Sequence, residues 1–426
     1  MAAITIHKAS HEGIGFSAVD LADVRHVFAA AVPRRGETLK EQTDDALRTI
    51  EAVMRDEGTR GSIVHQAVFI ADVALIPECQ QIIRDFYGPD LPATSYIPQP
   101  PCNGKLVSIE AMGVGRGRGE VEINRVGEHL VVASHNGISW VHCAQVVPTS
   151  PSDNVHEDSL NAFRQIRELF DSVGVRFDQI IRTWLYLGGI VADDGPTQRY
   201  KELNRARTDY YEDIRFLVDL LPDSCQGPIY PASTGIGTEG RGIMMSAIAL
   251  NSKRNDIRAV PLENPRQTAA YDYASRYSPK SPKFSRAMAL SCGTYATILV
   301  SGTASITDSE TRHIGDAAGQ TSETLDNIAA LISEANLSAH GLPGLGTTLD
   351  CLGGVRVYIK RQQDYEAVRA VCERRLGEMP TIYAQADVCR PDLLVEIEGI
   401  AFSHNSLTAL NAPIAPLADK LGVGDR

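Results

Sequence analysis

The chain lacks the surplus of positive charge that nucleic-acid binding requires. It has 41 Lys and Arg against 53 Asp and Glu, giving a formal net charge of −12 at pH 7. Phosphate binding depends on clustered cationic side chains. No window approaches the run of about 20 apolar residues that a membrane helix needs, and residues 1–8 lack the apolar segment of a signal peptide. These absences predict a cytoplasmic protein with a small-molecule ligand and neither a nucleic-acid nor a membrane partner.

Paired cysteines and metal-ligand spacings are also missing. The chain contains no CxxC pair and no Cys/His spacing of a zinc site. In a chain of this size, scattered cysteines are typical of reduced thiols in a cytosolic protein. We therefore expect no metal and no organic cofactor. The eight cysteines are Cys79, Cys102, Cys143, Cys225, Cys292, Cys351, Cys372 and Cys389.

The sequence does contain one order of elements three times. A length of 426 residues predicts roughly three domains, at about 150 residues each. Each segment has an apolar strand, an amphipathic helix, a buried strand, a second helix and a closing apolar strand. This order indicates an α+β layer repeated in one chain. We expect the first helices over residues 38–56, 156–172 and 317–335, and the opening strands over 27–32, 130–134 and 298–302.

These repeats define the predicted domains. The boundaries are 1–114, 115–255 and 256–408, followed by a tail over 409–426. The glycine-rich run 113–119 follows a strand but no helix begins after it, so it is interpreted as a linker rather than a phosphate loop.

The closing strand of the third repeat carries two acids. Strand side chains alternate between faces, so Glu396 and Glu398 share one face of an otherwise apolar strand. Such acids are costly unless they are paired or useful. Ile109-Glu110 of the first repeat matches Ile397-Glu398, which assigns Glu398 to the shared scaffold. Glu396 has no acidic counterpart in the other repeats and is the candidate functional acid.

The repeated unit resembles the RidA/YjgF domain. The resemblance is carried by Gln320-Thr321 and Leu325–Ile328 at a helix start, and by the terminal strand Val395–Glu398. Stand-alone members of that family are homotrimers with ligand sites between subunits, which implies an intramolecular pseudo-trimer here. In the enamine and imine deaminases of the family an Arg clamps the substrate carboxylate, but this chain has Thr94 at that place. The first domain is therefore expected to lack the ordinary deaminase site.

Residues 115–405 resemble the chorismatases more specifically. The shared motifs are Arg182–Tyr186, Tyr230–Gly237, Glu263–Tyr271, Ser301–Ile306 and Asp387–Glu398. Chorismatases cleave the enolpyruvyl ether of chorismate to pyruvate and a benzoate or dihydrodiol. The resemblance implies a lyase or hydrolase of secondary metabolism with a dianionic substrate. The first domain is expected to be a full extra module in place of the family's own short leader.

The same resemblance implies roles for individual residues. A Glu placed like Glu396 is the general acid that protonates the enol-ether methylene. Gly302 and Cys389 match the subfamily that makes 3-hydroxybenzoate, whereas Ala at both places marks the dihydrodiol-forming subfamily. The implied substrate contacts are Arg390, Arg207, Arg199, Tyr271, Ser301 and Thr303.

Simpler roles stay open for several of these residues. Glu396 could pair with an Arg of a neighbouring domain, Cys389 could be a packing thiol, and Tyr271 could be a core aromatic. The functional alternatives are an imine or enamine hydrolase, a cyclase, and a ligand-binding protein without turnover. Self-association beyond a monomeric pseudo-trimer also stays open.

Overall fold

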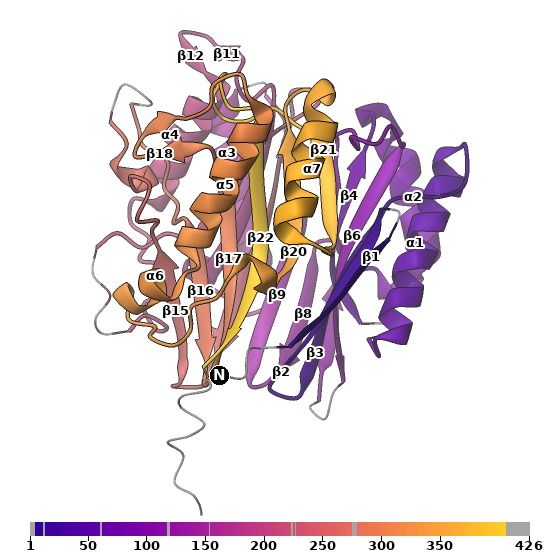
Figure 1. Ribbon diagram of the computed structural model, residues 1–426, viewed down its shortest axis with the longest axis horizontal. Helices are drawn as coiled ribbons and strands as arrows, with labels where there is room; N and C mark the ends of the chain where they lie inside the picture. Colours follow the sequence, from indigo (N-terminus) through magenta and orange to yellow (C-terminus); the bar gives the residue numbers. More distant parts are fainter. Residues whose placement is uncertain are drawn as a thin grey trace, which may run out of the picture.

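The computed structural model describes residues 5–405, except residues 12, 60–61, 117–119, 153, 223–224, 226 and 275–278. The predicted tail over 409–426 lies outside the described residues. The fold consists of three six-stranded sheets, one after another along the chain (Figure 1). We call each sheet with its helices a module.

Module one has the strand order β1-β2-β3-β6-β4-β5. Helix α1 begins at a capping box in which Thr38 and Glu41 satisfy each other's backbone N–H groups, and its buried stripe includes Leu47 and Ile50. The elements are β1 (Ile6–His11), β2 (Ile14–Leu21), β3 (Val24–Ala31), α1 (Leu39–Asp56), β4 (Ile63–Ile70), α2 (Ile76–Tyr87), β5 (Ala93–Ile97) and β6 (Val107–Arg116).

Module two has the equivalent order β13-β10-β14-β9-β8-β7. A two-stranded hairpin, β11–β12, precedes its second helix. The elements are β7 (Glu122–Val126), β8 (Leu130–His135), β9 (Ile138–Val146), α3 (Val155–Ser172), β10 (Ile180–Gly188), β11 (Asp193–Asp194), β12 (Thr197–Gln198), α4 (Arg199–Tyr211), β13 (Ala232–Thr238) and β14 (Ile243–Ser252).

Module three repeats the order as β15-β16-β17-β22-β20-β21, with a hairpin, β18–β19, after its third strand. The elements are β15 (Ile257–Leu262), β16 (Ala287–Cys292), β17 (Tyr295–Ala304), β18 (Ile306–Thr307), β19 (Glu310–Thr311), α5 (Ala317–Leu331), α6 (Glu334–Ala339), β20 (Leu352–Ile359), α7 (Tyr365–Leu376), β21 (Thr381–Gln385) and β22 (Val395–His404).

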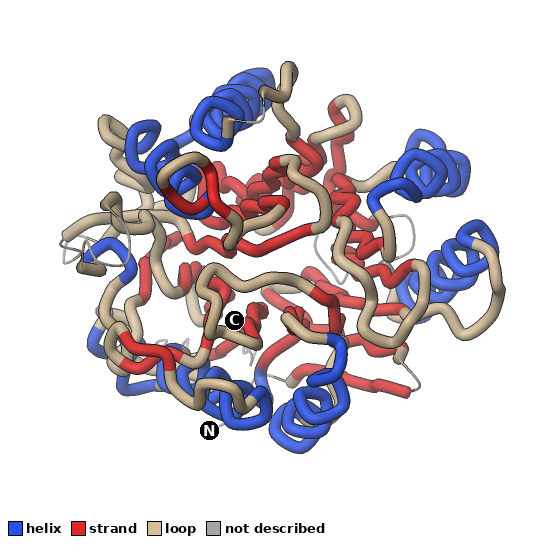
Figure 2. Tube along the Cα trace, turned by 90° about the horizontal axis from the view of Figure 1, so that it is seen from above, coloured by secondary structure: helices blue, strands red, loops and turns tan. Residues whose placement is uncertain are grey.

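The three modules pack around a common centre as a pseudo-trimer, the arrangement that the family resemblance implies. Seen from above, the helices lie around the outside and the sheets face the middle (Figure 2). Strand β5 of module one packs on β9 of module two, β13 packs on β17, and β20 of module three packs on β2. Each boundary between modules is therefore a contact of the same general kind. Among the described helices, none combines the length and the apolar character needed to cross a bilayer.

The α+β class is confirmed, but the expected strand content is wrong. Each sheet has six strands because an antiparallel hairpin precedes the first helix and a short parallel strand follows the second. In module two the strand that pairs with the closing strand is β9, not the expected strand over residues 130–134. The expected helix over 317–335 is two helices, because Ser333 caps a new one.

The glycine-rich run is also only partly a linker. Strand β6 extends to Arg116, so the first half of the run belongs to the sheet. A Cβ at Gly113 would lie 2.5 Å from Met54 Sδ, and one at Gly115 would lie 2.8 Å from the Gly58 carbonyl oxygen. These glycines let the end of α1 approach the sheet. Residues 117–119 lie outside the described residues.

The strand registers show which residues of the modules are equivalent. The strand that follows the first helix of each module, β4, β10 or β20, has a bulge at the same place. The bulge lies between Ile63 and His65 in β4, between Ile180 and Arg182 in β10, and between Leu352 and Gly354 in β20. Counting from this bulge puts Ser108, Met244 and Glu396 at one position of the closing strand, and Glu110, Ser246 and Glu398 two residues further on.

Candidate active site

A cavity of about 550 Å³ lies between modules two and three. Module two supplies residues of α4 and β13, and module three supplies residues of β17, β22 and the loop that precedes β22. We call this cavity the acidic cleft, because Glu396 forms part of its wall. Gln320 of α5 fixes that wall: its side chain accepts a hydrogen bond from the Leu394 N–H at 2.7 Å and donates to the Asp392 carbonyl at 2.9 Å.

The Glu396 carboxyl is held in its uncharged form. It is 4% exposed and lies between Ala304 of β17 and Tyr358 of β20. Within the described part of the chain it makes no hydrogen bond. Burial raises the pKa of Glu396 to about 8, and the negative charge of Glu398 adds to this shift, while Arg182 and Arg286 oppose it. At neutral pH the group is mainly a carboxylic acid.

Gly302 gives the Glu396 carboxyl its space. A Cβ at this position would overlap Glu396 Oε1 and lie 2.9 Å from its Cδ. The glycine lies in a bulge of β17, where two residues oppose one of β22. Its N–H donates to Thr234 Oγ1 of module two at 2.9 Å.

Glu398 lies two residues along the same strand and, unlike Glu396, is charged. Burial alone would raise its pKa, but the guanidinium groups of Arg182 and Arg356 outweigh this effect and lower it. It therefore links the modules as a charged group and is not part of the acidic cleft. The groups that donate to it are Arg182 Nη2 at 2.6 Å, Trp184 Nε1 at 2.8 Å, Arg356 Nη1 at 3.0 Å, Tyr358 Oη at 3.1 Å and the Thr234 hydroxyl.

Cys389 lines the acidic cleft beside the acid. Burial raises the pKa of its thiol to about 12, and the nearby Glu396 contributes to this increase. The thiol therefore stays protonated and is a poor nucleophile. Its position is that of a side chain that shapes the wall of the cavity.

Three arginines supply positive charge to the cleft. Arg207 and Arg286 are almost fully buried, and the Nε–H of each has no hydrogen-bond partner among the described residues. Arg286 Nη2 donates to the Thr268 carbonyl at 3.0 Å and to Tyr273 Oη at 2.6 Å. Arg390 also lines the cavity and donates to the Ser309 carbonyl at 2.8 Å. These groups suit an anionic ligand.

The other expected substrate contacts do not line the acidic cleft. Arg199 donates to the carbonyls of Gly188 and Arg241, which fixes the turn after β10. The Tyr271 ring packs against Tyr230, with centroids 5.7 Å apart.

Ser301 and Thr303 lie on either side of Gly302, but neither lines the cleft and the hydroxyl of each is bonded within the scaffold. The Ser301 hydroxyl donates to the Ser285 carbonyl at 2.6 Å and accepts from the Ser233 N–H at 2.9 Å. The Thr303 hydroxyl donates to the Ser301 carbonyl at 2.9 Å. Both are buried parts of the scaffold.

The cleft also contains residues that the sequence did not single out. Tyr200 follows Arg199 directly and shares one face of α4 with Arg207, seven residues on. Burial raises the pKa of Tyr200, so the phenol stays protonated. Ser233, Gly235, Tyr273 and Phe284 complete this side of the cavity. Within the described ranges, no three acidic, histidine or cysteine side chains converge as metal ligands.

The fold and the site together define a three-module α+β protein with a buried acid between two modules. A family profile described as "Chorismatase FkbO/Hyg5-like, N-terminal" matches residues 118–249. A 3-hydroxybenzoate synthase of Streptomyces hygroscopicus is 36% identical over 277 residues, which cover 62% of this chain and 76% of the relative. A chorismatase of Streptomyces rapamycinicus is 32% identical over 275 residues, covering 63% and 78%. The chain belongs to the chorismatase family and is an enzyme of that family.

A chorismatase crystal structure shows how far the shared fold extends. It superposes on this chain with a TM-score of 0.64 at 23% sequence identity. The superposed region covers 88% of this chain and 98% of the chorismatase chain. Modules two and three alone make up a smaller share of the chain. The expectation that module one is an addition to the family fold is therefore wrong.

Proposed function

We propose that the acidic cleft cleaves the enolpyruvyl ether of chorismate or a close analogue and releases pyruvate. The observation that carries this proposal is the uncharged Glu396 carboxyl, buried in a cavity of about 550 Å³ beside three arginines. The names of the relatives, chorismatase and 3-hydroxybenzoate synthase, supply the substrate class.

The charges of the cleft fit the charges of the substrate. Chorismate carries two carboxylates, whereas the protein has a net charge of −12. Binding therefore needs local positive charge. Arg207, Arg286 and Arg390, which all line the cleft, supply it. Tyr200 and Tyr273 offer hydroxyl groups to the same space.

The reaction begins with transfer of the Glu396 proton to the vinyl methylene carbon. The electron pair of the C=C bond forms the new C–H bond, and an oxocarbenium ion results. The oxygen of the neighbouring ring hydroxyl then attacks the ring carbon that bears the ether, so the bond from that carbon to the ether oxygen breaks, pyruvate leaves, and an epoxide forms with loss of the hydroxyl proton. The epoxide opens at the carbon that carried the hydroxyl, which leaves the oxygen on the former ether carbon, and loss of the ring proton from that carbon gives 3-hydroxybenzoate. An acid with a pKa near the working pH is suited to this transfer, and burial provides that value for Glu396.

We propose 3-hydroxybenzoate as the aromatic product. Pyruvate and 3-hydroxybenzoate together contain the same atoms as chorismate, so no water is consumed and the proton lost on aromatisation can restore the acid. A dihydrodiol would consume one water. Gly302 and Cys389, which match the subfamily that forms 3-hydroxybenzoate, border the carboxyl that starts the reaction.

The test is incubation of the purified protein with chorismate, followed by assay of pyruvate and chromatography of the ring product. Glu396→Gln removes the transferable proton, so pyruvate formation should fall by about 100- to 10,000-fold. Ser108→Ala, at the equivalent position of module one, is the matched control and should keep the wild-type rate.

Two results would overturn the proposal. One is the absence of pyruvate with the wild-type protein, and the other is an undiminished rate in the Glu396→Gln variant. Hydrolysis of a reactive enamine or imine without pyruvate release would instead indicate the deaminase chemistry of other YjgF proteins.

A further inference from the structure

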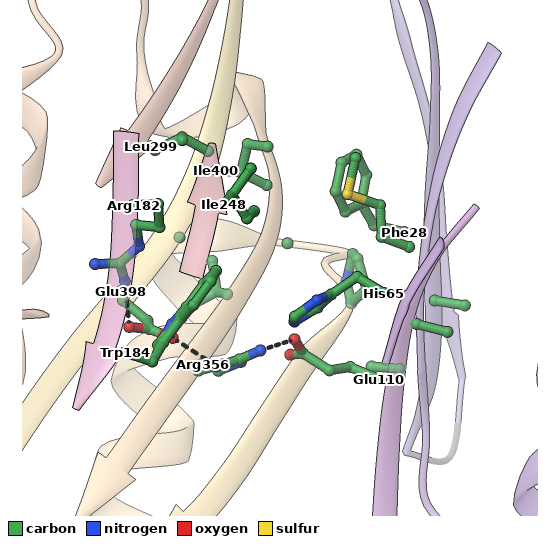
Figure 3. Close-up of a pocket in the computed structure, with 18 residues that line it drawn as sticks. Phe28, His65, Glu110, Arg182, Trp184, Ile248, Leu299, Arg356, Glu398 and Ile400 are labelled. Atoms are coloured by element: carbon green, nitrogen blue, oxygen red, sulfur yellow. Dashed lines mark hydrogen bonds and ion pairs between the residues drawn. The ribbon is translucent and has the colours of Figure 1, made fainter. Parts of the chain in front are cut away.

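A second cavity lies where the three modules meet, and it shares no lining residue with the acidic cleft. Its volume is about 100 Å³. One part of its wall is apolar and the other is polar (Figure 3). We call it the central cavity. The apolar wall is formed by Phe28, Met112, Ile248, Leu299 and Ile400.

A missing side chain in module three accounts for this space. His65 and Arg182 occupy the position after the strand bulge in modules one and two, and Gly354 occupies it in module three. A Cβ at Gly354 would be 3.7 Å from Phe28 Cβ and 4.0 Å from Ile400 Cγ2, which are ordinary contacts. A larger side chain would therefore fit at position 354 without a clash. Glycine is not required there by close packing, and its small size leaves part of the cavity empty.

The polar end is a row of charges that already compensate one another. Arg182 and Arg356 both bind Glu398, and Arg356 also binds Glu110 of module one (Figure 3). Two cations thus face two anions. A charged ligand would enter without a counter-charge of its own, and burying an uncompensated charge is costly. The row therefore favours a neutral ligand.

His65 gives the polar end an unused hydrogen-bonding group. Its ring stacks on Trp184, with centroids 5.5 Å apart, and the residue is only 7% exposed. Neither ring nitrogen bonds to a described residue, and Nδ1 is buried without a partner. Burial lowers the pKa of His65 well below 6.5, so the imidazole is neutral and offers one donor and one acceptor. A buried imidazole without a partner can form a hydrogen bond with the hydroxyl group of a ligand, which would satisfy it.

We propose that the central cavity is a second small-molecule site, for a neutral single-ring compound with one hydroxyl group. The ring packs against the apolar wall, and the hydroxyl bonds to His65 at the polar end. Phenol has this chemistry and a matching size, since dry apolar cavities of comparable volume hold benzene. The site is independent of the reaction proposed for the acidic cleft.

The experiment follows 4-fluorophenol by ¹⁹F NMR as the full-length protein is added. We expect saturable binding with a dissociation constant of about 1 mM or below. Gly354→Leu fills the cavity and should weaken binding at least about tenfold. Gly302→Gln obstructs the acidic cleft instead and should leave binding unchanged. Because Gly302 lines the acidic cleft and not the central cavity, the result for this variant separates the second site from the proposed active site.

Two further measurements test the chemistry of the polar end. His65→Phe keeps a ring on Trp184 but removes the hydrogen-bonding nitrogens, so it should weaken 4-fluorophenol about tenfold and leave fluorobenzene unchanged. The second measurement uses 4-fluorobenzoate, which is negatively charged. It should not bind to the central cavity of the Gly302→Gln protein, because that cavity favours a neutral ligand. If the Gly354→Leu variant does not fold, Gly354→Ala replaces it. The smaller side chain should cause an intermediate loss of affinity for 4-fluorophenol.

Three outcomes would overturn the proposal. The first is no saturable binding to the wild-type protein, and the second is binding that Gly354→Leu and Gly354→Ala leave unchanged. The third is binding that disappears in Gly302→Gln protein, because the ligand would then occupy the acidic cleft.

Discussion

The acidic cleft and the equivalent boundary between modules one and two have similar scaffolds and different side chains. In module three the bulge holds Gly302 and the closing strand holds Glu396. In module two the corresponding positions are Gln145 and Met244. Gln145 spans the boundary and accepts a hydrogen bond from the Tyr96 N–H at 2.8 Å. One boundary is a cavity with an acid, and the other is closed by a glutamine.

This difference shows that two properties must occur together. An acid in the closing strand is useful only where the bulge leaves space beside it. Space without the acid would be an inert cavity. Module one has neither property, since Ser108 replaces the acid and β3 pairs with β6 without a bulge. Exchanging residues between equivalent positions therefore tests which side chains separate a site from a contact.

The largest effect is expected at the scaffold acid. Glu398→Ser introduces the residue that module two has at this position, Ser246. Arg182 then loses its carboxylate in a buried place, and Arg356 keeps only Glu110. Breaking a buried ion pair in this way costs about 3–5 kcal/mol. Chemical unfolding followed by circular dichroism measures the loss.

Ser246→Ala is the control for this exchange, because Ser246 shares one neutral hydrogen bond with Ser95 at 2.7 Å. Its cost should be about 1 kcal/mol. Equal costs for the two variants would show that Glu398 is not the charged link between the modules.

The second exchange closes the acidic cleft. Gly302→Gln introduces the residue of module two, and the new side chain overlaps the Glu396 carboxyl. Displacing a catalytic group by about 1 Å costs about 100-fold in rate, so pyruvate formation should fall at least that far. The reverse change, Gln145→Gly, opens the other boundary and should leave the rate unchanged. A Gly302→Gln variant with near wild-type activity would place the chemistry elsewhere.

The sequence predicted the acids better than the pocket around them. Internal repeats separated Glu396 from Glu398, because the same strand occurs in each module. Ser301 and Thr303 were expected beside the substrate, but the hydroxyl of each donates to a backbone carbonyl of module three, which no sequence pattern indicates.

The remaining residues of the cleft depend on tertiary contacts. Arg286 follows an irregular segment with no hydrophobic period to place it, so the sequence does not indicate that it lines the cleft. Tyr200 could have been predicted, because residues seven positions apart lie on the same face of a helix and Arg207 was already expected to contact the substrate. Arg199, in contrast, binds backbone carbonyls of its own module, which no sequence period indicates.

The pH profile tests whether the two acids of β22 have opposite states. Glu396 acts in its protonated form, and burial raises its pKa to about 8. Activity from this group is therefore present below about pH 8 and is lost as the pH rises through that value, tenfold per unit. The measurement is kcat/KM for pyruvate release between about pH 3 and 10, with the fold checked by circular dichroism. A descending limb near pH 4 to 5 would show an ordinary exposed carboxyl.

The smallest effect on rate is expected at Cys389, which has no proton to give near neutral pH. Cys389→Ala keeps Glu396 and the arginines in place, so the total pyruvate rate should stay within about threefold of wild type, a difference below 1 kcal/mol. The space left by the sulfur admits water beside the reacting ring, and the ring product should shift from 3-hydroxybenzoate toward the dihydrodiol. Cys292→Ala, a thiol that does not line the acidic cleft, is the control for the product ratio. A rate loss as large as that of Glu396→Gln, with no change in product, would mean that the thiol takes part in the chemistry rather than shaping the wall.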